Sequence, residues 1–395
     1  MYEKLCVAFL FNSIVSSVRF PLMPMEVDLS DSSKGLCDTD NEQPLSQANV
    51  LFYAEMKIGT PFQSFRVLLD TSTSLSYVTT AESDRSPCKP GELQSSNCSR
   101  QLNCERNRYT SEKSETAHRL KLIGPNMEKQ VLAGTHFATD VVCLGKLCAK
   151  RTPFMLKSKA DKDITSLPCD GVLGLAHQTA SKFLLLPVIE KLAVEDKIID
   201  PSFTIWTKDD IRAGEIAGFL TIGEADTEHC TTDYQVLPVR EAKYWQFDVQ
   251  QVIRRPAVIT RHDNKPLKAI MNSGQNLLAG RPEIIEKMVA GLMAEERKDL
   301  FYINCSRIPD LPTFKFDLTL KNPHADVKFL ILEPNDYAFK IGNNCFLAFS
   351  KKRKVLEADL EFGTFLSKKF CQTYKYGKGA NGQDTASIVL SLKKN

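Results

Sequence analysis

Two short segments of the sequence carry residue types that could do acid–base chemistry. Residues 68–74 read Leu-Leu-Asp-Thr-Ser-Thr-Ser, and residues 270–276 read Ile-Met-Asn-Ser-Gly-Gln-Asn. Each begins with two apolar residues, followed by Asp or Asn, a hydroxyl residue and a small residue, which predicts a buried strand that ends in a hydrogen-bonded loop. Asp70 can exchange a proton, whereas the amide of Asn272 can only hydrogen-bond at ordinary pH. The repeat therefore predicts one titratable and one non-titratable centre.

The elements that must position these segments are mostly β-strands. The chain of 395 residues is long enough for two lobes, and we expect them at residues 49–205 and 206–395. From residue 49 onward, short apolar or alternating runs are separated by Gly, Pro, Asn and Asp, which is typical of strands. Helical patterns occur at residues 181–192 and 282–295. Residues 18–48 are polar and without periodicity, and we expect a short pro-like or flexible segment there.

The N-terminus resembles a secretory signal over residues 1–17. The apolar run Leu5–Phe11 follows Lys4 and leads to small residues that end at Ser17. A buried strand or a short membrane anchor is the alternative, but the run is shorter than the roughly 20 residues that a spanning helix needs. We therefore expect a secreted protein, or one of a secretory or endolysosomal compartment, with no membrane span.

Composition and charge name no partner. The chain is 43% hydrophobic and 25% charged, with a formal net charge of +3, which is ordinary for a soluble globular protein. So small a charge exerts little attraction on nucleic acid or an anionic membrane, and we expect neither as a partner. The run Lys351–Lys354 is compatible with a polyanion site or with a solvated hairpin tip, and we favour the tip. No cofactor is expected.

The cysteines indicate disulfides in a secretory protein. Of the twelve, Cys6 would leave with the signal, and the odd remainder implies a spare thiol or an intermolecular bond. Short spacings favour the pairs Cys98–Cys104 and Cys143–Cys148. A zinc site would need a further pair of ligands at the right spacing, and the six histidines are scattered, so no metal site is expected.

Ordered segments over residues 49–395 resemble the pepsin-like (family A1) aspartic peptidases. Asp-Thr-Ser alone is not specific, but the whole set in this order is. The matching segments are Tyr53–Pro61, Val67–Thr79, Asp170–Ala176, Tyr244–Phe247, Ala269–Gly280 and Asn304–Pro312. The resemblance implies a mostly β, bilobal, monomeric acid protease fold with an active-site cleft between the lobes. It also implies a disulfide between Cys305 and Cys345.

The resemblance further implies the roles of the repeated segments. Asp70 and Asn272 would face each other at the centre of the cleft, where the family uses two carboxylates that share one proton. The positions expected to contact substrate are Thr71, Ser72, Ser273 and Gly274, together with Ile123 and Gly124 in the segment that corresponds to the family's flap.

Several residues depart from the family pattern. Asn272 replaces the second carboxylate, Ser72 stands where Gly is usual, and Leu122–Pro125 lacks the usual flap Tyr. Gln275 and Asn276 replace bracing hydroxyl residues, and Leu360–Gly363 matches the family's late Leu-Gly-Asp element only loosely. Loss of a general acid or base costs on the order of a hundred- to ten-thousand-fold in rate, so we predict an inactive or weak peptidase.

Three functions are compatible with this pattern. The first is a peptidase homologue that binds peptide or protein in its cleft without efficient hydrolysis. The second is an active aspartic endopeptidase that uses Asp70. The third is a surface interaction protein with a vestigial cleft, for which the charged, cysteine-bearing residues 81–119 and 143–163 would be the contact loops.

Overall fold

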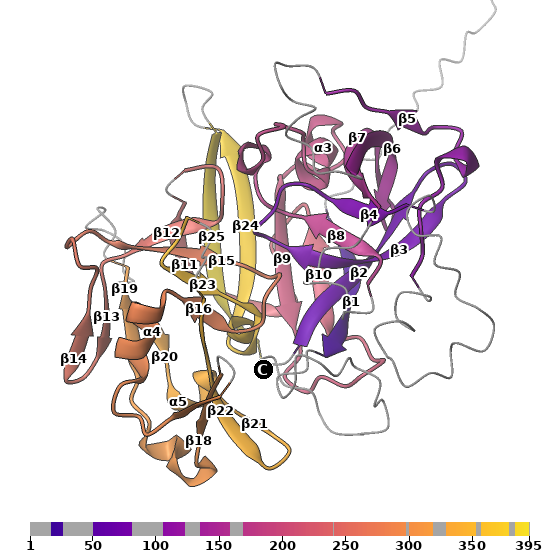
Figure 1. The fold of residues 1–395 in the computed structure, drawn as a ribbon. Helices are drawn as coiled ribbons and strands as arrows, with labels where there is room; N and C mark the ends of the chain where they lie inside the picture. Colours follow the sequence, from indigo (N-terminus) through magenta and orange to yellow (C-terminus); the bar gives the residue numbers. More distant parts are fainter. Residues whose placement is uncertain are drawn as a thin grey trace, which may run out of the picture.

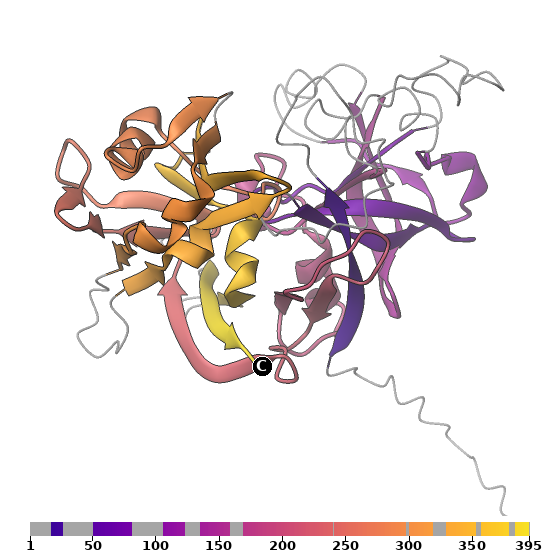
Figure 2. The same cartoon turned by 90° about the horizontal axis from the view of Figure 1, so that it is seen from below.

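The protein consists of two β-rich lobes joined by a shared sheet (Figure 1). In both views, the purple strands of the N-terminal half and the orange elements of the C-terminal half lie on opposite sides, with β24 and β25 between them (Figure 2). This confirms the mostly β, bilobal fold expected from the sequence. The computed structural model describes residues 17–26, 50–80, 106–122, 135–158, 169–239, 241–297, 300–318, 329–352, 357–378 and 384–394.

The largest sheet has thirteen strands and runs from the lobe junction through the N-terminal lobe. The predicted boundary between residues 205 and 206 falls inside β9, a strand within this sheet, and the division into lobes at that residue stays a prediction. In spatial order the strands are β11 (Cys230–Pro238), β25 (Asp384–Lys393), β24 (Phe370–Lys378), β9 (Ser202–Thr207), β10 (Gly218–Ile222), β1 (Val18–Glu26), β2 (Val50–Ile58), β3 (Gln63–Asp70), β8 (Gly171–Gly174), β4 (Tyr77–Thr79), β7 (Leu147–Lys157), β6 (Thr135–Leu144) and β5 (His118–Arg119).

Two smaller sheets build the C-terminal lobe. The first contains, in order, β12 (Gln246–Val249), β15 (Leu267–Met271), β23 (Leu360–Phe362), β16 (Leu278–Gly280), β22 (Asn344–Lys351), β18 (Leu300–Ile303) and β17 (Glu295–Arg297), with β21 (Ala338–Ile341) paired to β22. The second contains β14 (Ala257–Ile259), β13 (Gln251–Arg254), β19 (Phe314–Asp317) and β20 (Phe329–Leu332).

Helices are short. The α-helices are α3 (Val188–Val194), α4 (Pro282–Val289) and α5 (Pro334–Tyr337), and the 3-10 helices are η2 (Ser111–Lys113), η4 (Gln178–Ala180), η5 (Cys305–Asp310) and η6 (Thr364–Lys368). The helix expected at residues 181–192 begins only after Pro187, because proline disfavours helical geometry in the residue before it. Within the described residues, no helix is both long and apolar enough to cross a membrane.

Strand β1 corrects one expectation. Residues 18–48 were expected to be a short pro-like or flexible segment, but residues 18–26 pair with β10 on one side and β2 on the other and are therefore not flexible. The pro-like character of the segment stays a prediction. The side chains of Phe20, Leu22 and Met25 are buried, and this apolar content was hidden by prolines and the surrounding polar sequence. The signal at residues 1–17 stays a prediction, since residues 1–16, like residues 27–49, lie outside the described part of the chain.

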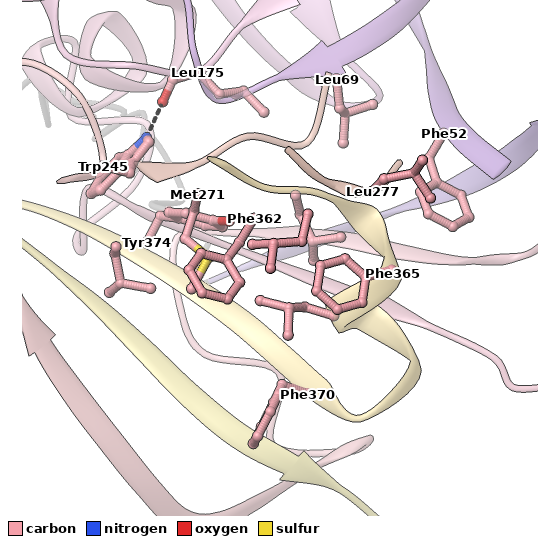
Figure 3. Packing of buried hydrophobic residues seen from close by; sticks show 14 of the residues in the cluster. Phe52, Leu69, Leu175, Trp245, Met271, Leu277, Phe362, Phe365, Phe370 and Tyr374 are labelled. Carbon is pink, nitrogen blue, oxygen red and sulfur yellow. Dashed lines mark hydrogen bonds between the residues drawn. The ribbon is translucent and has the colours of Figure 1, made fainter. Parts of the chain in front are cut away.

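One large hydrophobic core continues from lobe to lobe. Figure 3 shows Leu69 of β3 and Met271 of β15 in this cluster, with Phe362 of β23 nearby. Trp245 is fully buried and donates its indole N–H to the carbonyl oxygen of Leu175 at 2.8 Å. The core therefore ties the strands that end in the two repeated segments to one another.

Three disulfides are present among the described residues. Cys143–Cys148 and Cys305–Cys345 are pairs that the sequence led us to expect, and Cys230–Cys371 is an additional one. Cys169 is a free, buried thiol whose pKa is raised by burial to about 11. The expected pair Cys98–Cys104 lies outside the described residues.

Candidate active site

The repeated segments occupy equivalent places in the two lobes. Asp70 is the last residue of β3, which pairs in parallel with β8 so that Asp70 lies opposite Gly174. Asn272 directly follows β15, which pairs in parallel with β23, and its N–H donates to the carbonyl oxygen of Phe362 at 2.9 Å. Each loop thus leaves a buried strand beside one short parallel strand, as a duplicated motif requires.

A glycine at the end of each supporting strand lets the loop close. A Cβ on Gly174 would lie 2.7 Å from the carbonyl carbon of Ser74, and one on Gly363 would lie 2.6 Å from the carbonyl oxygen of Leu277. Neither distance is compatible with a side chain, so both positions require glycine. The segment Leu360–Gly363, which matches the family only loosely by sequence, serves its lobe as Gly171–Gly174 serves the other.

Four hydrogen bonds join the loops across the junction. The N–H of Thr71 donates to Ser273 Oγ at 3.1 Å, and the N–H of Ser273 donates to Thr71 Oγ1 at 3.0 Å. Each hydroxyl also donates across the junction, Thr71 to the Met271 carbonyl at 2.8 Å and Ser273 to the Leu69 carbonyl at 2.9 Å. Thr71 and Ser273 are buried. Their hydroxyls hold the lobes in register, and their predicted contact with substrate stays a prediction.

The Asp70 carboxyl lies against the opposite loop. Its Oδ1 accepts hydrogen bonds from the N–H and the hydroxyl of Ser72, at 2.7 and 2.6 Å. A Cβ placed on Gly274 would come within 2.9 Å of Asp70 Cγ, so only glycine permits this approach. Desolvation raises the pKa of Asp70, although residue 70 retains some solvent exposure; the Ser72 hydrogen bonds oppose that shift, and the charge of Glu361 adds to it.

The Asn272 side chain has two partners and is only 6% exposed. Its Oδ1 accepts from the N–H of Gly274 at 2.9 Å, and its Nδ2 donates to Glu361 Oε2 at 3.1 Å. Lys352 Nζ lies 3.0 Å from the same Glu361 oxygen. The neighbouring Gln275 donates its Nε2 to the Glu361 carbonyl at 3.0 Å, so an amide rather than a hydroxyl braces this loop.

Sequence reasoning missed Glu361 and Lys352. The available signal was a glutamate inside the apolar strand β23, since a charge at such a position needs a partner. Lys352 was assigned to a solvated hairpin tip, which is wrong for the first two residues of that run. Lys351 contacts Glu286 and Glu296, and Lys352 contacts Glu361.

Ile123 and Gly124 lie outside the described residues. A pocket of about 480 Å³ opens in the N-terminal lobe between Tyr109, His118 and Phe137. At the two repeated positions the site offers one carboxyl, on Asp70, that can take up and release a proton, and one amide, on Asn272, that can only hydrogen-bond.

Comparison with known proteins finds matches to aspartyl proteases, in agreement with the family resemblance seen in the sequence. A family model described as eukaryotic aspartyl protease matches residues 51–377. Phytepsin from Hordeum vulgare is 29% identical over 67% of this chain, and pregnancy-associated glycoprotein 4 from Ovis aries is 26% identical over 78%. Vacuolar protease A from Arthroderma otae is 23% identical over 85%. The match covers 50% of phytepsin, 75% of the glycoprotein and 78% of the vacuolar protease.

Proposed function

Because the chain belongs to the eukaryotic aspartyl protease family, we propose that it is a pepsin-like homologue of the secretory pathway that binds extended peptide or protein segments between its lobes. Hydrolysis of peptide bonds is weak or absent. The observation that carries this proposal is the amide of Asn272, which is hydrogen-bonded on both sides at the position where the family places its second carboxylate.

The chemistry of amide hydrolysis requires both groups to titrate. One carboxylate takes a proton from the attacking water while its partner gives one to the carbonyl oxygen of the substrate. Asp70 can serve in either role, but Asn272 in neither. The junction between the two loops is nevertheless intact, since its four hydrogen bonds are all made.

Peptide binding is supported by the architecture. Exposed strand edges and backbone can offer main-chain hydrogen bonds to an extended chain, and pockets can receive its alternate side chains. The pocket beside Tyr109 and Phe137 combines aromatic and polar lining and is large enough for a side chain. The secretory location is supported by three disulfides, which persist in oxidising compartments.

An active endopeptidase is the second candidate, and one observation favours it. The pKa of Asp70 is raised by desolvation, as expected of a carboxyl that must hold a proton for part of a catalytic cycle. In that case a single carboxyl would have to alternate between acid and base.

Cleavage and binding assays separate the two candidates. A denatured protein substrate is incubated with wild type and Asp70→Ala between pH 3 and 7, and binding of a statine-type peptide is measured by calorimetry. We expect binding by wild type without cleavage. Cleavage by wild type that disappears in Asp70→Ala would establish the endopeptidase instead, and the absence of both binding and cleavage would refute both functions.

A further inference from the structure

A buried carboxylate stands directly behind Asn272. Glu361 in β23 has no solvent-exposed surface, and its Oε2 lies 3.1 Å from Asn272 Nδ2 and 3.0 Å from Lys352 Nζ. A buried charge is costly unless it is paired and hydrogen-bonded. Lys352 supplies that charge from the end of β22, with its side chain 43% exposed. The carboxylate is therefore held in place from two sides.

The N-terminal lobe shows what else this backbone position can hold. In the parallel pair β3 and β8, Leu68 lies opposite Val172, and in the parallel pair β15 and β23, Ile270 lies opposite Glu361. Val172 and Glu361 each stand two residues before the glycine that closes their loop. They are counterparts in the duplicated motif. One lobe fills the position with an aliphatic side chain, and the other with a carboxylate.

Donor and acceptor chemistry fixes the orientation of the Asn272 amide. The N–H of Gly274 can only donate, and a carboxylate beside an ammonium group accepts. The amide satisfies both by turning its oxygen to Gly274 and its nitrogen to Glu361. An aspartate at 272 would place its second oxygen against Glu361. Two carboxylates so close cannot both ionise, and they would share one proton with each other.

We propose that Glu361, held by Lys352, is a positioning residue whose carboxylate favours an amide over a carboxylate at position 272. The C-terminal lobe thus carries its carboxylate on the strand behind the loop, where the N-terminal lobe has Val172. An aspartate at 272 then works with Asp70 only when Glu361 is neutral. Among the described residues, Lys352 contacts Glu361, and the charge of Glu361 acts on Asp70 across the junction. The catalytic part of this proposal rests on the proposed function, and the structural part does not.

The reciprocal exchange Asn272→Asp with Glu361→Gln tests the proposal. The exchange keeps the number of carboxylates, and the introduced glutamine can donate its amide to the introduced aspartate while its oxygen accepts from Lys352. We compare wild type, N272D, E361Q and N272D/E361Q in peptide cleavage at pH 3–7. We expect the double variant to exceed N272D by about a hundredfold or more, the typical contribution of a general acid or base. Equal activity of N272D and N272D/E361Q would overturn the proposal.

Thermal unfolding supplies a readout that does not depend on activity. In N272D the paired carboxyls keep a proton in the folded state at a pH where both ionise in the unfolded chain, near their ordinary values of about 4. The folded state then binds more protons, so the stability of N272D relative to wild type falls as pH rises above about 4. In N272D/E361Q only the introduced carboxyl and Asp70 can share a proton, so this fall is smaller than in N272D.

The two readouts separate the failure of each proposal. A midpoint of N272D that tracks wild type across pH 3–7 would overturn the positioning role of Glu361, whatever the protein binds. Absence of peptide binding by wild type would overturn the proposed function. The unfolding midpoints of N272D and wild type would still test the positioning role of Glu361.

Discussion

In the N-terminal lobe, Asp70 ends its strand with a carboxyl that Ser72 holds by two hydrogen bonds, and the neighbouring strand carries the aliphatic Val172 opposite Leu68. In the C-terminal lobe, Asn272 follows its strand with an amide that Gly274 holds by one backbone hydrogen bond and Glu361 holds from behind. The strands, closing glycines and cross-junction hydrogen bonds are the same in both. The lobes share this geometry but differ in the position of the carboxyl, which is on Asp70 at the start of the loop in one lobe and on the strand residue Glu361 in the other.

The difference shows that the residues that hold the two loops together and the residues that could exchange protons are separate requirements on a sequence. The hydroxyls of Thr71 and Ser273 serve the junction, and the junction is complete whether or not a carboxylate lies beside it. A family match that depends on these framework residues therefore identifies the fold without identifying the activity.

The largest effect is expected from removing a hydroxyl that makes the hydrogen bonds between the two loops. Thr71→Val keeps the side-chain shape but leaves the N–H of Ser273 and the carbonyl of Met271 without their partner. Unpaired buried groups cost about 1–3 kcal/mol each, so we expect a loss of about 3 kcal/mol in urea unfolding at pH 7. Ser273→Ala should cost a similar amount. Thr231→Val, which removes an exposed hydrogen bond to the Asp233 carbonyl, is the control, and an equal loss there would contradict the prediction.

The second prediction concerns the ion pair between Lys352 and Glu361, which lies behind the C-terminal loop. Lys352→Met leaves the buried Glu361 without its cation. We expect a loss of about 2 kcal/mol in denaturant unfolding at pH 7, less than for a fully buried pair because Lys352 is partly exposed. The matched control is Lys351→Met, whose partners Glu286 and Glu296 are exposed, and a change within about 1 kcal/mol is expected there. Equal losses in both variants would argue against a special role for Glu361.

The third prediction makes the N-terminal loop more like its counterpart. Ser72→Ala removes the hydroxyl that donates to Asp70 Oδ1 while keeping the backbone N–H. Because this hydrogen bond favours the charged form, its loss should raise the pKa of Asp70, which carbon-detected NMR titration can follow. Stability at pH 7 should fall by about 1 kcal/mol. A pKa that stays or falls would show that the hydroxyl does not stabilise the carboxylate.

The smallest expected effect is a gain in stability for Asp70→Asn that disappears at low pH. Desolvation raises the pKa of Asp70, so the folded protein keeps this proton at a pH where the unfolded chain has lost it. The charged carboxyl therefore lowers stability as pH rises above its unfolded value of about 4. Asp70→Asn should be more stable than wild type at pH 7, and the difference should shrink to nothing near pH 3. A difference that grows on acidification would reverse the sign of the inferred shift.

The sequence predicts the framework better than the network around it. The repeat at Asp70 and Asn272 was visible because its residues are contiguous, and the pair Cys143–Cys148 because five positions separate it. Glu361 meets Asn272 only through strand pairing across 89 positions, which no local pattern encodes, and Lys352 joins this network through Glu361. The strand Val18–Glu26 was missed because its apolar residues lie among prolines and it is stabilised by neighbours on both sides.

The disulfide between Cys230 and Cys371 has a mechanical consequence. It spans 141 positions, and every strand of the two smaller sheets lies within the loop that it closes. Both cysteines belong to the sheet at the lobe junction, so a pulling force applied along the chain would pass through the sulfur bridge instead of through the C-terminal lobe. That lobe would keep its length under a load that extends the rest of the molecule, and reduction of the bridge would add its unfolding to the extension.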